Sequence, residues 1–155
     1  MSKYYKNSST IGKHHKFDPY LHEKYDIPAR KKIKEVLGDL VEDNPDQKQQ
    51  DLIIKSDTCK YKFLEIQVCA SWITKTFPFK NVWVYERKDK YGDDTLFLTL
   101  DKFLKRGYLF KAICLKNIKP RRKEKYCREY VYDIPWNQVM PITVEHLDKE
   151  TIELF

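Results

Sequence analysis

Hydrophobic residues near the start of the chain recur at the spacing of a helix. An apolar stripe predicts an amphipathic helix over residues 28–42, and its members are Ile33, Val36, Leu37, Leu40 and Val41. Pro28 falls in the first turn, where proline is tolerated, and Pro45 is typical of a residue just beyond a helix end. The pattern therefore places one well-defined helix early in the chain.

Beyond this helix the apolar residues occur in short aromatic and β-branched runs, which are typical of β-strands. The expected strands cover residues 51–55, 61–68, 81–86, 95–100, 108–115 and 126–134. The turn 56–60 joins the first two strands into a hairpin. Short helices are expected over 102–106, ended by Gly107, and after Thr143. No repeat or linker divides this series, so residues 18–155 are predicted to form one α/β domain.

Charge is unevenly distributed along the 155 residues, whose formal net charge is +7. Residues 101–130 contain eleven basic and three acidic side chains, whereas residues 35–57 contain two basic and seven acidic ones. A basic block favours a polyanionic partner. An acidic cluster in such a protein favours a cation that lies between the protein and the polyanion. Mixed solvated faces would give the same charges. Residues 1–17 are polar and lysine-rich, and they are predicted to form a flexible basic arm.

The sequence also argues against several classes of protein. No run of about 18 apolar residues exists, so a membrane-spanning helix is not expected. The N-terminal residues lack the apolar core of a secretory signal, so secretion is not expected. The four cysteines lack the paired spacing of a zinc site or a disulfide framework. They indicate reduced thiols and a cytoplasmic or nuclear location.

The hairpin is the part of the sequence that indicates chemistry. If its turn closes symmetrically, Ile53 lies opposite Phe63 and Asp51 lies opposite Glu65, and opposed residues share a face of the sheet. Gln67 lies on the same face because it is two residues beyond Glu65. Two neighbouring carboxylates repel each other unless a cation lies between them, and oxygen ligands favour Mg²⁺ or Mn²⁺. Such an ion binds a phosphate oxygen and lowers the pKa of an attacking water, as phosphodiester hydrolysis requires.

The stretch Asp51-Leu-Ile-Ile, followed on the next strand by Glu65-Ile-Gln-Val, resembles the PD-(D/E)XK nuclease superfamily. The order of elements is similar too, because a helix precedes the hairpin. The resemblance covers residues 28–100 and implies a restriction-endonuclease-like α/β fold, with a mixed β-sheet flanked by helices. It also implies a magnesium-dependent nuclease in which Asp51 and Glu65 bind the metal and act in catalysis together with Gln67.

Two positions depart from the family pattern. Gln67 stands where the family has a lysine, and a glutamine orients water through hydrogen bonds but carries no charge. Lys75 or Lys80 are candidates to supply the missing cation from elsewhere in the chain. Family members also often present an acidic residue from the first helix. Glu35 falls on the solvent face of the predicted helix, and Glu23, before it, is a weaker substitute.

The basic block 101–130 is the predicted phosphate-contacting surface. Its nucleic-acid-binding residues are expected to be Lys102, Lys105, Arg106, Lys119, Arg121, Arg122, Lys123, Lys125 and Arg128. Contacts to phosphate give affinity without reading sequence. Tyr108, Tyr126 and Tyr130 are interleaved with these cations, either to stack on unpaired bases or to pack in the core.

The sequence therefore predicts a metal-dependent nuclease that hydrolyses DNA or RNA. The alternative is a catalytically inactive relative that binds nucleic acid or acts as a virion or assembly protein, and an unrelated basic adaptor is a third reading. Frequent Lys, Ile, Tyr and Asn are typical of AT-rich genomes, many of which are viral. Neither the kind of nucleic acid nor the position of cutting is indicated.

Overall fold

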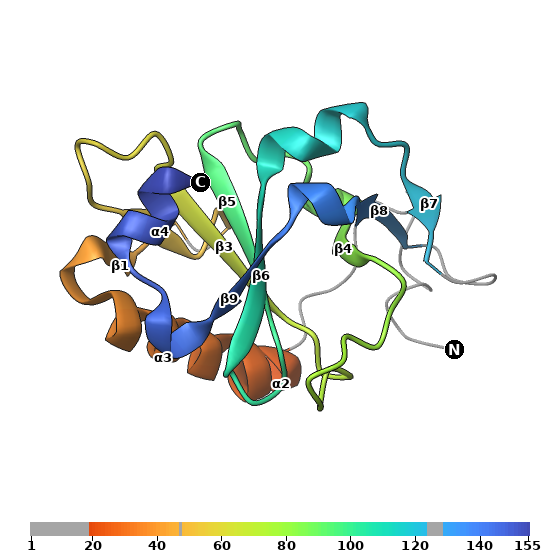
Figure 1. Ribbon diagram of the computed structural model, residues 1–155, viewed down its shortest axis with the longest axis horizontal. Coiled ribbons are helices and arrows are strands. Elements are labelled where there is room, and N and C mark those ends of the chain that lie inside the picture. Colours follow the sequence, from red (N-terminus) through yellow and green to blue (C-terminus); the bar gives the residue numbers. More distant parts are fainter. Residues whose placement is uncertain (1–18, 47, 124–128) are drawn as a thin grey trace.

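The computed structural model describes residues 19–46, 48–123 and 129–155 (Figure 1). The predicted basic arm 1–17 and two predicted phosphate-contacting residues, Lys125 and Arg128, lie outside this part of the chain. Within it, no helix is long and apolar enough to cross a membrane. The cysteines in the same ranges are free thiols, as expected: Cys59, Cys69 and Cys114.

A mixed six-stranded sheet forms the centre of the molecule, in the order β1-β2-β3-β5-β6-β9 (Figure 1). Its strands are β1 (Val41–Asp43), β2 (Leu52–Ile54), β3 (Phe63–Val68), β5 (Thr95–Leu100), β6 (Arg106–Lys111) and β9 (Met140–Thr143). Neighbouring strands are antiparallel, except that β3 and β5 run parallel. The β2–β3 pair is the predicted hairpin, and Ile53 lies opposite Phe63 as the sequence predicts.

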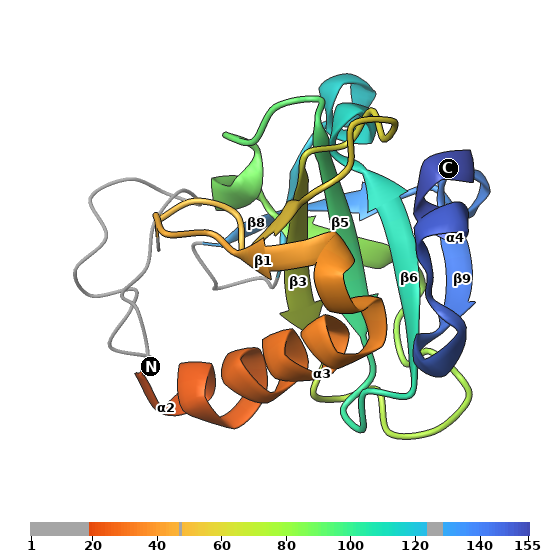
Figure 2. The ribbon, with the colours of Figure 1, turned by 90° about the vertical axis from the view of Figure 1, so that its left-hand side faces the viewer.

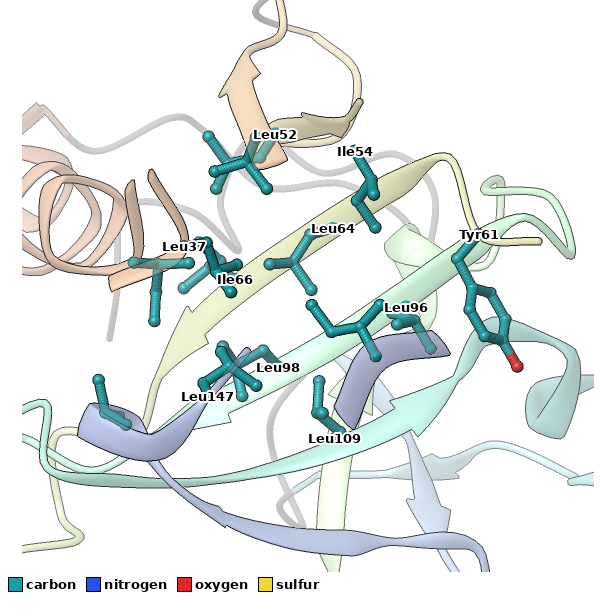
Figure 3. Close-up of a cluster of buried hydrophobic side chains, with 14 of the residues drawn as sticks. Leu37, Leu52, Ile54, Tyr61, Leu64, Ile66, Leu96, Leu98, Leu109 and Leu147 are labelled. Atoms are coloured by element: carbon teal, nitrogen blue, oxygen red, sulfur yellow. The ribbon is translucent and has the colours of Figure 1, made fainter. Parts of the chain in front are cut away.

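The helices α3 and α4 pack on one face of this sheet, and Figure 2 shows α3 across the ends of β3 and β5. The helices are α2 (Pro19–Leu21), which a π-helical turn (His22–Asp26) connects to α3 (Ile27–Leu37), and the C-terminal α4 (Lys149–Leu154). Buried apolar side chains from α3, α4 and the sheet share one core (Figure 3), among them Ile33, Leu37, Leu52, Leu64, Ile66, Leu98 and Ile152. Because side chains alternate along a strand, Glu65 and Gln67 point to the opposite face of the sheet from Leu64 and Ile66.

A small antiparallel sheet covers that opposite face. Its strands, in the order β4-β8-β7, are β4 (Val82–Tyr85), β8 (Tyr130–Ile134) and β7 (Arg121–Arg122). Val84 and Ile134 form a second core with Phe97 and Phe110 of the large sheet. The mixed α/β class is confirmed, but in the described ranges the α-helices α3 and α4 pack on one face of the large sheet and the small sheet covers the other.

The first helix is shorter than its apolar stripe predicts. α3 ends at Leu37 because Gly38 has a φ of 57°, in the left-handed region that favours glycine and ends helices. The chain then reverses, and Val41 pairs with Ile54 as part of β1. Val41 is therefore buried in the predicted core, but it reaches that core from a strand.

The segment after β5 also differs from the prediction. A tight turn replaces the helix expected over 102–106, since the buried Asp101 carboxylate accepts the backbone N–H groups of Lys105 (2.7 Å) and Arg106 (3.1 Å). The next strand starts earlier and ends earlier than expected, because the 3₁₀ segment Ala112–Asn117 follows it. The C-terminal helix is confirmed, and Asp148 caps it by accepting the N–H of Thr151.

Candidate active site

A cavity of about 520 Å³ lies where α2, the π-helical turn and the start of α3 meet β3 and the end of β4. Its wall includes three carboxylates, Asp26, Asp51 and Glu65, together with five cationic side chains. The cations are Arg30, Lys48, Arg87, Lys88 and Lys90. They come from α3, from the β1–β2 connection and from the turn after β4. The cavity therefore surrounds its acidic groups with an excess of positive charge.

The hairpin brings Asp51 and Glu65 together in this cavity, as its register predicts. Asp51 sits just before β2, and its backbone N–H donates to Glu65 Oε1 at 3.1 Å. In return, Asp51 Oδ2 accepts the backbone N–H of Ile66 at 2.8 Å. Each acidic residue is thus held by the backbone of the other strand, which fixes the position of both carboxylates.

A cation pairs with each of the two carboxylates. Arg30 donates to Asp51 Oδ1 at 3.0 Å, and the Lys88 ammonium lies 2.8 Å from Glu65 Oε2. Glu65 is only 5 % exposed, so its charge is almost fully removed from water. Asp51 keeps about a fifth of its side-chain surface exposed, at 19 %.

Burial raises the pKa of Glu65 from its ordinary value near 4.5 to about 7. The Lys88 ammonium offsets only part of the desolvation, and the neighbouring Asp51 carboxylate raises the pKa further. Near neutral pH, Glu65 is therefore divided between its protonated and ionised forms. A cation that entered beside it would favour the ionised form, so binding of such a cation should release protons.

This shifted pKa predicts that the folded protein loses stability as the pH rises. The folded state binds the Glu65 proton more tightly than the unfolded chain, so the Glu65 contribution to the unfolding free energy is highest below pH 4.5, falls as the pH rises from 4.5 to about 7, and levels off above that. From pH 5.5 to 8 the Glu65 contribution should fall by about 2 kcal/mol. Urea unfolding of wild type and Glu65→Gln at both values measures it. Equal pH dependence in the two proteins would contradict this prediction.

Asp26 is an acidic residue of the site that the sequence analysis missed. It lines the cavity from the π-helical turn that precedes α3, and its Oδ2 lies 3.3 Å from His22 Nδ1. The two helical candidates, Glu23 and Glu35, are exposed and lie outside the cavity wall. The available signal was the four-residue spacing of His22, Asp26 and Arg30, which places polar side chains on one helix face.

Gln67 lies in the cavity wall, but its amide group holds the two sheets together. Gln67 Nε2 donates to the backbone oxygen of Trp83 at 2.9 Å and to Thr99 Oγ1 at 2.6 Å. Both amide hydrogens are therefore committed, and only Oε1 remains to accept a hydrogen bond from water. The amide cannot donate to a phosphate in place of the family lysine.

Lys88 supplies the cation beside Glu65, a role for which the sequence offers Lys75 and Lys80 as candidates. Those two lysines are exposed and do not line the cavity, whereas the Lys88 side chain is 18 % exposed and faces Glu65. Lys88 follows β4 in a 3₁₀ turn, which folds back over the hairpin. No pattern in the sequence indicates this contact, because it depends on how the second sheet packs against the first.

The predicted basic surface is dispersed over the structure. Lys102 and Lys105 lie in the turn between β5 and β6, whereas Arg121 and Arg122 form β7 at the edge of the small sheet (Figure 1). Three of these cations contact neighbouring side chains within the protein: Arg106 pairs with Asp101, Arg121 pairs with Asp133, and Arg122 donates to Tyr130. Lys119 is exposed. Lys123 does contact the cavity wall, since it donates to Tyr85 at 2.9 Å.

The site meets part of the requirement for a divalent metal ion. Asp51 and Glu65 provide two hard anionic ligands in one cavity, which suit Mg²⁺ or Mn²⁺. Each of their four oxygens already accepts one hydrogen bond or ion pair, so an ion would share these oxygens with Arg30 and Lys88 or displace one of the two cations. In the described ranges, no three His, Cys, Asp or Glu residues are arranged to hold a metal ion.

Comparison of the chain with family models, curated proteins and solved structures found no match.

Proposed function

We propose that the chain is a metal-dependent nuclease that hydrolyses phosphodiester bonds of DNA or RNA with Mg²⁺ or Mn²⁺. The observation that carries the proposal is the Asp51–Glu65 pair, with the Lys88 ammonium on Glu65, inside a cation-rich cavity. Paired carboxylates suit a divalent ion, and fixed cations suit a phosphate and the negative charge that develops on it.

We further propose that the fold is restriction-endonuclease-like. In support, α3 precedes the β2–β3 hairpin that places Asp51 and Glu65, and the sheet that contains the hairpin is mixed. The small sheet over one face departs from the pattern of a sheet flanked by helices.

Four residues of the site have roles in this proposal. Asp51 and Glu65 would hold the ion, which when bound would polarise a phosphate oxygen and lower the pKa of water. Lys88 would exchange its contact with Glu65 for one with a phosphate oxygen. Gln67 Oε1 would accept a hydrogen bond from the attacking water and orient it.

One observation favours a second function, that of a catalytically inactive nucleic-acid-binding or assembly protein. Arg30 and Lys88 already neutralise the two carboxylates in the absence of any added ion. A site with such internal cations can bind phosphate without cutting it.

Incubating the purified chain with single-stranded and duplex DNA and RNA, in Mg²⁺, Mn²⁺ or EDTA, tests the proposal. We expect cleavage with either ion and none in EDTA. Calorimetric titration with Mn²⁺ should show binding that releases protons at pH 7, because Glu65 must ionise. Tight nucleic-acid binding without cleavage under any condition would establish the second function and reject the first.

Nucleic-acid binding should weaken steeply with salt, and the cavity cations should carry part of that dependence. Lys48 and Lys90 are exposed residues of the cavity rim. Replacing both by Ala should reduce the slope of log affinity against log salt by about 1 to 2, because each phosphate contact contributes about 0.7 to 0.9. The double variant Lys102→Ala/Lys105→Ala is the comparison, and we expect a smaller change there. An unchanged slope for the Lys48/Lys90 variant would rule out these residues as phosphate contacts.

A further inference from the structure

The cavity that holds the carboxylate pair is also lined by aromatic side chains. They come from the first helix, the loop after β3, β4 and the turn that follows it: Tyr25, Phe77, Trp83, Tyr85 and Tyr91. Aromatic rings in a positively charged groove are the combination by which proteins bind unpaired nucleotides, because every base has a face that can stack.

β4 directs two of these rings to the cavity by simple alternation. Val82 and Val84 are buried in the second core, so Trp83 and Tyr85 point to the other side of the strand. Their ring centroids are 5.1 Å apart in an edge-to-face arrangement, and the Lys123 ammonium lies 4.7 Å from the Trp83 ring. A cation thus lies close to the aromatic wall, as a nucleotide with a phosphate would require.

Gln67 fixes the distance between this aromatic wall and the carboxylates. Its amide donates to the backbone oxygen of Trp83, and it lies two residues from Glu65 on the same face of β3. Trp83 is therefore tied by one hydrogen bond to the strand that carries Glu65. Trp83 and Glu65 line the same cavity, so a base against Trp83 and a phosphate near Glu65 would occupy it together.

The depth of the site limits which substrates can reach it. Glu65 is 5 % exposed, at the bottom of a cavity of about 520 Å³. Cavities of about 300 to 1,000 Å³ enclose single small molecules, which is the size of one nucleotide and far smaller than a duplex. A duplex is far larger than this cavity, so a phosphate would reach Glu65 most readily from a nucleotide that has left the helical stack, and leaving the stack costs energy in a duplex.

We propose that the cavity takes an unpaired nucleotide, so that the substrate is single-stranded nucleic acid, with the base against Trp83 and the phosphate at the Lys88 ammonium beside Glu65. This inference rests on the proposed nuclease function for its chemistry, but the preference for single strands is a property of binding and can be measured without cleavage.

The test is fluorescence anisotropy in EDTA, with labelled single strands of about 12 nucleotides and a blunt duplex of the same sequence. Wild type should bind the single strand at least tenfold more tightly than the duplex. Trp83→Leu should weaken single-strand binding about 5- to 150-fold, the range for loss of one stacked base, and should leave duplex binding unchanged. Trp83→Phe, which keeps a ring, should retain most of the preference and shows whether the position tolerates substitution.

Trp136→Leu is the matched control, because Trp136 is 44 % exposed and lies outside the cavity wall. It should bind both probes as wild type does. Equal affinity of wild type for single strand and duplex, or loss of both affinities together in Trp83→Leu, would overturn the inference. If the protein then cut duplex, the nuclease proposal would still stand. A Trp83-dependent preference without any cutting would support the inference and reject the nuclease proposal.

Discussion

Asp51→Asn and Glu65→Gln are each expected to lower the rate of nucleic-acid cleavage by about 1,000-fold or more. Each change removes one of the two anionic ligands in the cavity, and a bound metal contributes several kcal/mol of transition-state stabilisation, where about 1.4 kcal/mol is tenfold in rate. Calorimetric affinity for Mn²⁺ should fall in the same variants. Cleavage rates at saturating substrate, across a series of Mn²⁺ concentrations, measure both effects.

Asp93→Asn is the matched control for these variants. Asp93 is an exposed carboxylate paired with Lys116 at 2.9 Å, and it lies outside the cavity wall. Its replacement should change neither cleavage nor metal affinity. Thermal unfolding must show that Asp51→Asn is folded, because that change weakens the partner of Arg30. Folded Asp51→Asn that cuts at the wild-type rate would remove the basis of the proposed mechanism.

The hairpin could be predicted from sequence because its two strands are neighbours along the chain. Alternation of apolar and polar residues fixes which face each side chain takes, and a short connection limits the register. Ile53 and Phe63 are paired as predicted, and Asp51 and Glu65 consequently share one cavity. The chemistry of the pair could thus be inferred without knowledge of the rest of the fold.

The second sheet could not be predicted in the same way. Val82 of β4 pairs with Ile134 of β8, about fifty residues later, and the apolar pattern of a strand does not specify a partner at that distance. Lys88 owes its position beside Glu65 to the turn that follows β4. For this reason the sequence indicates Asp51 and Glu65 but not the cation that pairs with Glu65.

The distribution of charge along the chain does not locate the cations of the site. The most basic segment, 101–130, contributes to two separate parts of the structure, whereas the cavity gathers its cations from short stretches of mixed charge. Lys48, for example, belongs to the acidic segment 35–57 and yet lines the site. A charge density along the sequence predicts a surface only when consecutive residues lie together in space.

Lys88→Ala should reduce cleavage by about 100-fold, the usual effect of removing one electrostatic contact to the transition state. It should also shift the acidic limb of the pH–rate profile upward, because the Lys88 ammonium lowers the pKa of Glu65 and its loss leaves burial and Asp51 to raise that pKa further. Lys60→Ala, at an exposed position outside the cavity, should change neither. Rate profiles from pH 6 to 9 distinguish a loss of charge from a loss of structure. A loss of structure would lower the rate without moving the acidic limb of the profile.

Gln67→Lys in the Lys88→Ala background gives the sharper test of whether Lys88 replaces the family lysine. Position 67 lies on the same face of β3 as Glu65, so a lysine there would place an ammonium in the cavity from the strand itself. We expect about a tenfold recovery of cleavage, incomplete because the bonds from Gln67 to Trp83 and Thr99 are lost and the site is held less firmly. Gln67→Met in the same background lacks both the bonds and the charge, and should recover nothing. Equal rates for the Lys and Met variants would show that the charge beside Glu65 takes no part in the reaction.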